Sequence, residues 1–274
     1  MKALVLSVPA GDAELASDAL WALGVVAVEE RDPTPPTEDH LVELWTSLGD
    51  DVDAVTRAAE GFPSRWRWRL VDVDESVADT WRQHAVPTWV EADLVVCPAW
   101  VPIDVADEVT VLRIEPGSTF GLGDHPTTML SMRALRRAVF RGATVLDVGC
   151  GSGVLAIAAA RFGASRVEAI DIAPAAVPTT RDNALANQVD ALVHVSTTPL
   201  ADVDGCYDVV VANILAPTLV ALADDLRRVL SPSGVLIVSG LLADRHDHVE
   251  AALAPLHLVD RDTRDGWAAL TLRA

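Results

Sequence analysis

The sequence predicts an α/β chain built from a small N-terminal α+β domain and a larger domain in which strands and helices alternate. Three observations support this prediction. Residues 1–70 show strand-like and helix-like segments in the order β-α-β-β-α-β. From Ala143 onward, apolar strand-like segments and helix-like segments follow one another in turn. Half of the 274 residues are hydrophobic, so the chain can bury a sizeable core.

The pattern over residues 1–70 is that of a split βαβ unit and predicts a ferredoxin-like domain. We expect a linker over residues 71–88, whose charged composition favours a linking helix. Gly24 is placed to cap the first helix of the domain at its C-terminus. The strands are expected at residues 3–8, 25–31, 41–47 and 65–73, and the helices at residues 12–23 and 50–62.

Residues 89–274 form the predicted second domain. Two strand-like segments open it, at residues 89–100 and 107–117. The alternation that begins at Ala143 predicts a parallel sheet with helices on both faces. In such open sheets, ligands bind outside the carboxyl ends of the strands. Glycines and polar residues at those ends are therefore the candidates for a functional site.

The segment VLDVGCGSG, residues 145–153, is the first such candidate. Its glycines let the backbone take positive φ and let a ligand approach closely. Dinucleotide enzymes use a similar strand, loop and helix with the spacing G-x-G-x-x-G. Here the spacing is D-x-G-x-G-x-G from Asp147, and Val154 stands where the last glycine of the dinucleotide motif would be. This favours a nucleoside ligand without a pyrophosphate over NAD.

Two polar residues at other strand ends strengthen this interpretation. Asp171 ends the next strand, 18 residues after Gly153, where a carboxylate can accept hydrogen bonds from both ribose hydroxyls. Asn213 ends the fourth strand of the series. An asparagine there could simply cap the following helix. Because Gly149, Asp171 and Asn213 should converge on one crevice, we favour a role for Asn213 in the site.

A fourth motif is FGLGDHPTT, residues 120–128, which precedes a long helix-like segment. Thr127 or Thr128 would lie at the N-terminus of that helix, whose free amides favour carboxylates. A proline-containing turn with a threonine cap would explain part of this pattern. The added glycines and His125 indicate more than a cap.

Together these segments resemble the ribosomal protein L11 methyltransferases, the PrmA family. The resemblance covers nearly the whole chain, and the N-terminal stretch VPAGDAELASDALWALGVVAVEE is similar to the family's recognition domain. The most specific matches are FGxGxHPTT and VVANIL. The other matching segments are VLDVGCGSGVLAIAAARFGA, IDIAPAAVPTTRDNALANQ and the terminal GWAALTLR.

The resemblance implies a Rossmann-like class I methyltransferase domain with a mostly parallel seven-stranded sheet, and S-adenosylmethionine as cofactor. It also implies transfer of methyl groups to lysine side chains or to the N-terminal amine of a large-subunit ribosomal protein. Asn213 is the expected catalytic residue, orienting the amine, and no dedicated general base is evident. The expected cofactor-binding residues are Thr128, Gly149, Gly151, Asp171, Asn213 and Phe120.

The composition agrees with a basic protein partner. The formal net charge of −19 repels phosphate backbones, so we expect no direct nucleic-acid binding. The longest mostly apolar run, residues 209–223, is too short and too interrupted to span a bilayer, and no signal-peptide cleavage pattern is present. Three cysteines without metal-ligand spacing disfavour a disulfide framework or a metal site. We expect a cytoplasmic monomer.

The chain departs from the family pattern in two places. Leu122 replaces the usual threonine of FGTG, Asp124 stands where a small polar residue or histidine is common, and the linker WRQHAVP lacks the usual Lys-Phe pair. These differences affect the acceptor more than the cofactor. Three alternatives therefore stay open: a methyltransferase for another protein or a small molecule, a non-catalytic cofactor-binding protein, and an NAD dehydrogenase, which Val154 disfavours.

Overall fold

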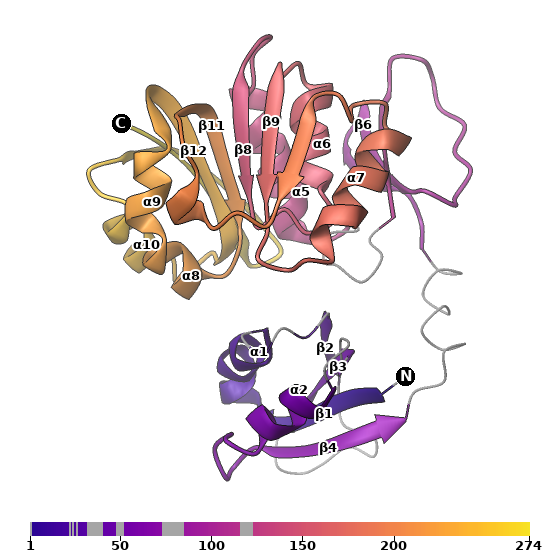
Figure 1. The fold of residues 1–274 in the computed structure, drawn as a ribbon, viewed down its shortest axis with the longest axis vertical. Coiled ribbons are helices and arrows are strands. Elements are labelled where there is room, and N and C mark those ends of the chain that lie inside the picture. Colours follow the sequence, from indigo (N-terminus) through magenta and orange to yellow (C-terminus); the bar gives the residue numbers. More distant parts are fainter. Residues whose placement is uncertain are drawn as a thin grey trace. The chain divides into compact units, whose positions relative to one another are not determined.

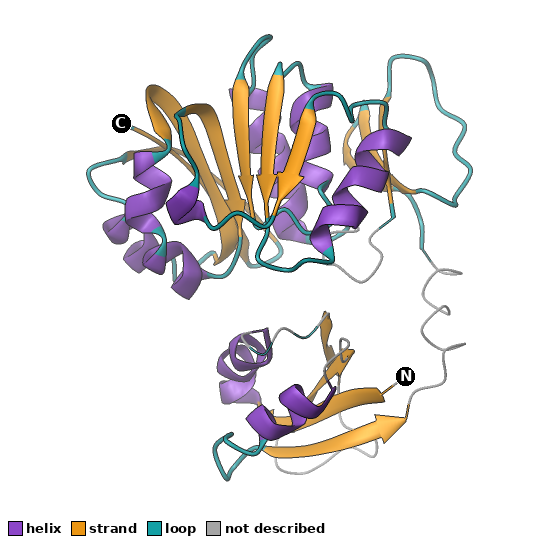
Figure 2. Cartoon of the chain, viewed as in Figure 1, coloured by secondary structure: helices purple, strands orange, loops and turns teal. Residues whose placement is uncertain are grey.

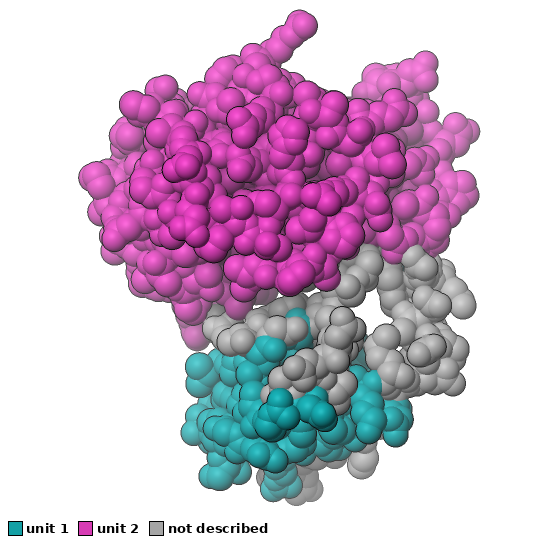
Figure 3. All heavy atoms as spheres, viewed as in Figure 1, with its two compact units in different colours: residues 1–85 teal, residues 86–274 magenta. Residues whose placement is uncertain are grey.

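The chain forms two compact units, residues 1–85 and 86–274, each with its own sheets and core (Figure 3). No helix in the described part of the chain is long and apolar enough to cross a membrane. The computed structural model describes residues 2–21, 23, 25, 27–31, 41–47, 52–72, 85–115 and 123–274.

In the first unit, four antiparallel strands pair in the order β2-β3-β1-β4, with one helix after β1 and one after β3 (Figure 1). Leu4, Leu6 and Val8 alternate along β1 and pack with Leu20 of α1, because side chains two apart on a strand share a face. The elements are β1 (Lys2–Pro9), α1 (Ala13–Trp21), β2 (Ala27–Arg31), β3 (Leu41–Ser47), α2 (Val52–Ala59) and β4 (Arg67–Asp72).

The other face of this sheet carries Trp45 and the arginine side chains around it. Val5 pairs with Trp45 on one side and with Arg69 on the other, and it is fully buried. The guanidinium groups of Arg31 and Arg69 lie 4.6 and 5.8 Å from the centre of the Trp45 ring. Glu43 accepts two hydrogen bonds from Arg69, at 2.8 and 3.1 Å. This face is therefore covered by its own side chains.

The second unit contains a seven-stranded sheet with the order β10-β9-β8-β11-β12-β14-β13, and a three-stranded sheet with the order β5-β6-β7 (Figure 2). The strands from β10 to β12 are parallel neighbours, whereas β14 is antiparallel to β12 and to β13. The strands are β5 (Thr88–Glu91), β6 (Leu94–Pro98), β7 (Thr110–Ile114), β8 (Thr144–Val148), β9 (Arg166–Ile170), β10 (Val193–Ser196), β11 (Tyr207–Asn213), β12 (Leu230–Leu242), β13 (His257–Arg264) and β14 (Trp267–Arg273).

The α/β class is confirmed, and the large sheet is mixed because the chain ends in a hairpin. Asp265 and Gly266 join β13 to β14, and both have positive φ, at 51° and 82°. Two such residues form the tight turn whose twist suits antiparallel strands. A parallel connection would instead need a crossover of a dozen residues or more.

Helices cover both faces of the seven-stranded sheet, so its strands are apolar on both sides (Figure 2). Val209 and Val211 of β11 belong to the core that includes α5 and α6, whereas Val210 and Ala212 belong to the core that includes α8 and α9. The helices are α5 (Pro126–Ala138), α6 (Val154–Arg161), α7 (Ala176–Ala186), α8 (Ala216–Ala221), α9 (Ala223–Arg228) and α10 (Asp247–Ala252).

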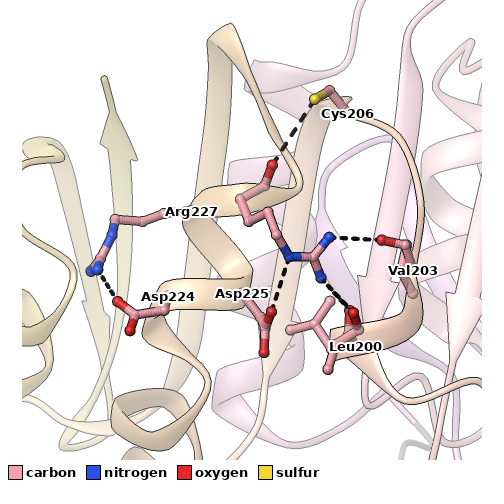
Figure 4. A network of polar contacts seen from close by, with 8 residues as sticks. Leu200, Val203, Cys206, Asp224, Asp225 and Arg227 are labelled. Atoms are coloured by element: carbon pink, nitrogen blue, oxygen red, sulfur yellow. Dashed lines mark hydrogen bonds and ion pairs between the residues drawn. The ribbon is translucent and has the colours of Figure 1, made fainter.

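Arg228, at the end of α9, ties that helix to the segment that leads into β11. Figure 4 labels its partners Leu200, Val203 and Asp225. Its guanidinium group donates to the carbonyl oxygens of Leu200 and Val203, at 2.7 and 2.8 Å, and to the carboxylate of Asp225 at 3.0 Å. The thiol of Cys206 lies against the carbonyl oxygen of Arg228. These contacts fix the amino end of the strand whose carboxyl end carries Asn213.

Candidate active site

The predicted strand, glycine loop and helix are present in order: β8 ends at Val148 and α6 begins at Val154. Gly149 and Gly153 have φ of 75° and 80°, a region that other residues rarely adopt. A Cβ at Gly149 would collide with the side chain of Ile214, and one at Gly153 would lie 2.6 Å from Cγ2 of Thr180. Glycine is therefore required at both positions by conformation and by space.

Asp171 lies directly against this loop. Its Oδ2 accepts a hydrogen bond from the Gly151 amide, and its Oδ1 accepts one from the Ala173 amide, both at 2.8 Å. Two backbone donors thus fix the carboxylate, and each oxygen keeps a lone pair for another donor. Ile172, the next residue, is 92% exposed and offers an apolar surface beside the carboxylate.

Asp147 is a second carboxylate of the loop, and the sequence analysis used it only as part of the motif. It is 1% exposed, and its Oδ2 accepts a hydrogen bond from the amide of Ala156 in the first turn of α6, at 3.0 Å. Its Oδ1 has no hydrogen-bond partner. Burial raises the pKa of Asp147 to about 7; the Ala156 amide opposes this and the charge of Asp171 adds to it.

Thr128 and Asn213 meet at the other end of the candidate site. Thr128 lies in the first turn of α5, and Asn213 ends β11. The side-chain nitrogen of Asn213 donates to the hydroxyl of Thr128 at 3.5 Å, the long limit for such a bond. The two residues come from segments 85 positions apart in the sequence.

His125 holds the first turn of α5 in place. Its Nδ1 accepts from the amide of Thr127 at 3.3 Å and lies 2.7 Å from the Thr127 hydroxyl. Burial lowers the pKa of His125, against a smaller opposing effect of Asp124, and so favours the neutral imidazole. Its ring lies edge-on to Trp267, with 5.0 Å between centroids. Because its Nδ1 accepts from the first turn, His125 serves as the N-cap residue of α5.

Ile214 connects the two ends of the site, a feature that the sequence analysis missed. Its side chain occupies the space left by Gly149, and its carbonyl group occupies the space left by Gly240 of β12. Gly240 has φ of 86° and lies where the pairing of β12 with β14 shifts register. The sequence contains one signal of this contact: Gly240 lies inside a strand-like segment, and a glycine there often marks a bulge or a close backbone approach.

The structure brings the predicted residues together in two pairs. Gly151 contacts Asp171, and Thr128 contacts Asn213. Gly149 joins the pairs through Ile214. Phe120 and the variant Leu122 lie outside the described residues, and Asp124 is exposed.

These features suit a nucleoside ligand with an amino-acid tail. The glycines hold the loop in a tight positive-φ turn, the Asp171 carboxylate is fixed to accept hydroxyl groups, and Ile172 provides an apolar contact for a base. Oδ1 of Asp147 is a further buried polar atom of this segment without a hydrogen-bond partner. Within the described ranges, no three His, Cys, Asp or Glu side chains are grouped so as to hold a metal ion.

Comparison with known proteins gives a consistent family. The model of the ribosomal protein L11 methyltransferase (PrmA) family matches residues 6–274. A ribosomal protein L11 methyltransferase of Geobacter metallireducens is 40% identical over 244 residues, covering 88% of this chain and 79% of the relative. One of Methylococcus capsulatus is 37% identical over 288 aligned positions, covering 97% of each.

Among solved structures, a ribosomal protein L11 methylase of Lactobacillus delbrueckii subsp. bulgaricus is 34% identical, with a TM-score of 0.63. The match covers 68% of this chain and 96% of that one. The sequence relatives and this solved structure thus agree on one family. The chain belongs to the ribosomal protein L11 methyltransferase (PrmA) family.

Proposed function

We propose that this chain transfers methyl groups from S-adenosylmethionine to amines of ribosomal protein L11, at lysine side chains, the N-terminal amine or both. The observation that carries the proposal is the placement of the Gly151–Asp171 pair and the Thr128–Asn213 pair on either side of Ile214. The first pair suits a nucleoside, and the second offers polar side chains for the amine. Family membership supports the same reaction.

In this proposal the cofactor lies along the glycine loop. The carboxylate of Asp171 accepts hydrogen bonds from the ribose hydroxyls, and the backbone at Gly149 and Gly151 allows close approach. Ile172 packs on the base. Thr128, Asn213 and Phe120 complete the set proposed to bind the cofactor. When bound, S-adenosylmethionine supplies an electrophilic methyl group on a positively charged sulfur.

The acceptor amine must lose a proton before it can attack. A lysine with a pKa of about 10.4 costs roughly 4 kcal/mol to deprotonate near pH 7.4, whereas an α-amine near 7.7–8.0 costs less than about 1 kcal/mol. Because the nitrogen of Asn213 faces Thr128, its Oδ1 is placed to accept a hydrogen bond from the amine and to orient the lone pair. Positioning of this kind supplies most of the acceleration when reacting atoms are held in line.

The first unit is proposed as the substrate-recognition domain. We assign residues 1–70 to a ferredoxin-like fold, residues 71–88 to a linker and residues 89–274 to the methyltransferase domain. The β2-β3-β1-β4 order with antiparallel neighbours supports the first assignment. The net charge of −19 favours a basic protein partner over nucleic acid. A monomer acting in the cytoplasm is part of the same proposal.

Intact-mass analysis of purified L11 after incubation with the enzyme and S-adenosylmethionine tests this function. We expect mass increases in steps of one methyl group, and none without the cofactor. An unchanged mass of L11, together with heat on titration of the enzyme with the cofactor, would mean that the methyl acceptor is another protein or a small molecule. No heat in that titration would refute the cofactor proposal itself.

A further inference from the structure

Helix α7 turns a row of polar side chains toward the protein interior. Thr180 and Asn183 lie on α7, and Asn187 is its C-cap residue; their spacing of three and four positions places them on one side of the helix. They are 0%, 2% and 4% exposed. Buried polar groups need hydrogen-bond partners, and here those partners are backbone groups of β7 and of the glycine loop.

The two asparagines clamp the chain at the end of β7. Asn187 accepts from the amide of Arg113 at 2.8 Å and donates to its carbonyl oxygen. Asn183 accepts from the amide of Glu115 and donates to its carbonyl oxygen, both at 2.8 Å. Positions four apart on a helix are separated by about 6 Å along its axis, close to the 6.6 Å or so between positions two apart on a strand. The spacing of the asparagines therefore matches that of the strand.

Each asparagine makes a third hydrogen bond, and these differ. The side-chain nitrogen of Asn187 donates to the backbone carbonyl oxygen of Asn183 in α7, at 2.8 Å. The side-chain nitrogen of Asn183 donates to the backbone carbonyl oxygen of Ser152 in the glycine loop, at 2.9 Å. Thr180 donates to the adjacent carbonyl oxygen, that of Gly151, at 3.1 Å. Helix α7 therefore binds two successive carbonyl groups of the loop.

We propose that Asn183, assisted by Thr180, is a positioning residue for the cofactor. Its side-chain amide joins Ser152 to Glu115, the residue that leads into the segment carrying Phe120. With the loop carbonyls of Gly151 and Ser152 held by α7, the Gly151 amide is presented to Asp171. The inference rests on the proposed function, because it assigns Asn183 to the cofactor side of that site.

Asn187 provides a matched control for Asn183. Both side chains are buried, both make three hydrogen bonds, and both bind one residue at the end of β7. Only Asn183 reaches the glycine loop. The variants Asn183→Ala and Asn187→Ala should therefore lower Tm by similar amounts. Their cofactor affinities should differ, by about the tenfold that corresponds to one buried hydrogen bond.

The test is calorimetric titration of the full chain with S-adenosylmethionine, followed by steady-state kinetics with L11. We expect Asn183→Ala to bind at least tenfold more weakly than wild type, and Asn187→Ala to stay within about threefold. In Asn183→Ala the KM for the cofactor should rise while kcat at saturation stays near the wild-type value. Equal affinities for the two variants would overturn the inference and make both residues purely structural.

Thr180→Val keeps the test decisive if Asn183→Ala does not fold. It preserves the shape of the side chain and removes the hydroxyl, which donates to Gly151 and contacts the thiol of Cys150 in the same loop. Weaker cofactor binding by about fivefold, with little change in Tm, supports the inference, whereas unchanged binding contradicts it. If the wild-type chain gives no heat on titration with S-adenosylmethionine, the proposed function itself is refuted. If the wild-type chain binds the cofactor and the variants bind it as tightly as wild type, only the positioning role is refuted.

Discussion

The two sides of the candidate site are held by different kinds of contact. On the cofactor side, comprising residues 149–153 and Asp171, backbone amides make hydrogen bonds of 2.8 Å to the carboxylate of Asp171 and to the carbonyl oxygen of Ile170. On the acceptor side, Thr128 and Asn213 share one side-chain contact at 3.5 Å. The Asp171 carboxylate on the proposed cofactor side is therefore fixed by two backbone donors, whereas the Asn213 side chain on the proposed acceptor side keeps hydrogen-bonding capacity for an amine.

This difference suits a methyltransferase whose second substrate is a protein. A small cofactor benefits from a preformed site, since little ordering remains to be done on binding. A protein substrate brings its own side chain into the site, and side-chain hydrogen bonds that tighten only on binding are common in enzymes before substrate arrives. Variants on the two sides should consequently affect different kinetic constants.

The largest effect is expected for Asn213→Ala on the acceptor side. Loss of the group that orients the amine should reduce kcat by a hundredfold to about a thousandfold, as for other single positioning groups. Cofactor affinity should fall by less than about tenfold, because the contacts of Asp171 remain. Turnover with L11 and calorimetry with S-adenosylmethionine measure the two effects. Wild-type turnover would remove Asn213 from the mechanism.

Asp171→Asn should show the reverse pattern on the cofactor side. The amide keeps the shape but loses the charge, and with it the charge-assisted hydrogen bonds proposed to the two ribose hydroxyls. Its nitrogen also cannot accept one of the two bonds from the Gly151 and Ala173 amides. We expect the Kd for S-adenosylmethionine to rise about a hundredfold. Asp182→Asn, which changes an exposed acid on α7, is the control and should bind normally. If the two variants bound the cofactor equally well, the ribose assignment would fail.

A smaller effect concerns the buried carboxylate on the cofactor side. The pKa of Asp147 is about 7 in the folded chain, against about 3.9 in an unfolded one, so between these values the folded state holds a proton that the unfolded state has released. Stability from this group is therefore greatest at low pH and falls as pH rises from about 4 to 7. Asp147→Asn should remove that slope.

Denaturation of wild type and Asp147→Asn at pH 5 and pH 8 measures this difference. Relative to wild type, the variant should gain roughly 3 kcal/mol in free energy of unfolding between the two pH values, since each pKa unit corresponds to about 1.4 kcal/mol. The hydrogen bond from Ala156 can be kept by the oxygen of the new amide. Parallel pH profiles would show that Asp147 is ionised in the folded chain across this range.

Much of the site could be predicted from the sequence because its residues end apolar strands. Gly149 and Asp171 each follow such a strand and Asn213 ends one, and parallel strands bring their carboxyl ends to one edge. The Asn183 clamp could not be predicted, because it depends on a contact between segments 68 residues apart. The Ile214 contact with Gly240 likewise depends on the spacing of two neighbouring strands.

The fold, like the site, has features that the sequence predicts and features that it does not. The order of strands and helices follows local periodicity, which the sequence displays directly. The helix-like segment at residues 217–230 divides at Leu222 into α8 and α9, with the amide of Leu222 bonded to the carbonyl oxygen of Thr218. The direction of β14 also depends on a two-residue turn, at Asp265 and Gly266. These features depend on short turns, which cannot be predicted from hydrophobic periodicity.

The smallest predicted effect tests whether Ile214 holds the acceptor side in place. Gly240 and Gly142 both have positive φ, at 86° and 94°, so alanine at either position costs about 1–2 kcal/mol in backbone strain. A Cβ at Gly240 would lie 2.9 Å from the carbonyl carbon of Ile214, whereas one at Gly142 would have no atom within 4 Å. Gly240→Ala should therefore lose about 2 kcal/mol more stability than Gly142→Ala.

Activity separates the two variants further. Because Ile214 follows Asn213, pushing its carbonyl group away from β12 should displace Asn213 from Thr128 and lower kcat about tenfold, with the cofactor Kd nearly unchanged. Gly142→Ala should keep normal kcat. Equal kcat in both variants would show that Asn213 keeps its place without Ile214, and that the acceptor side is more tightly held than its one long hydrogen bond indicates.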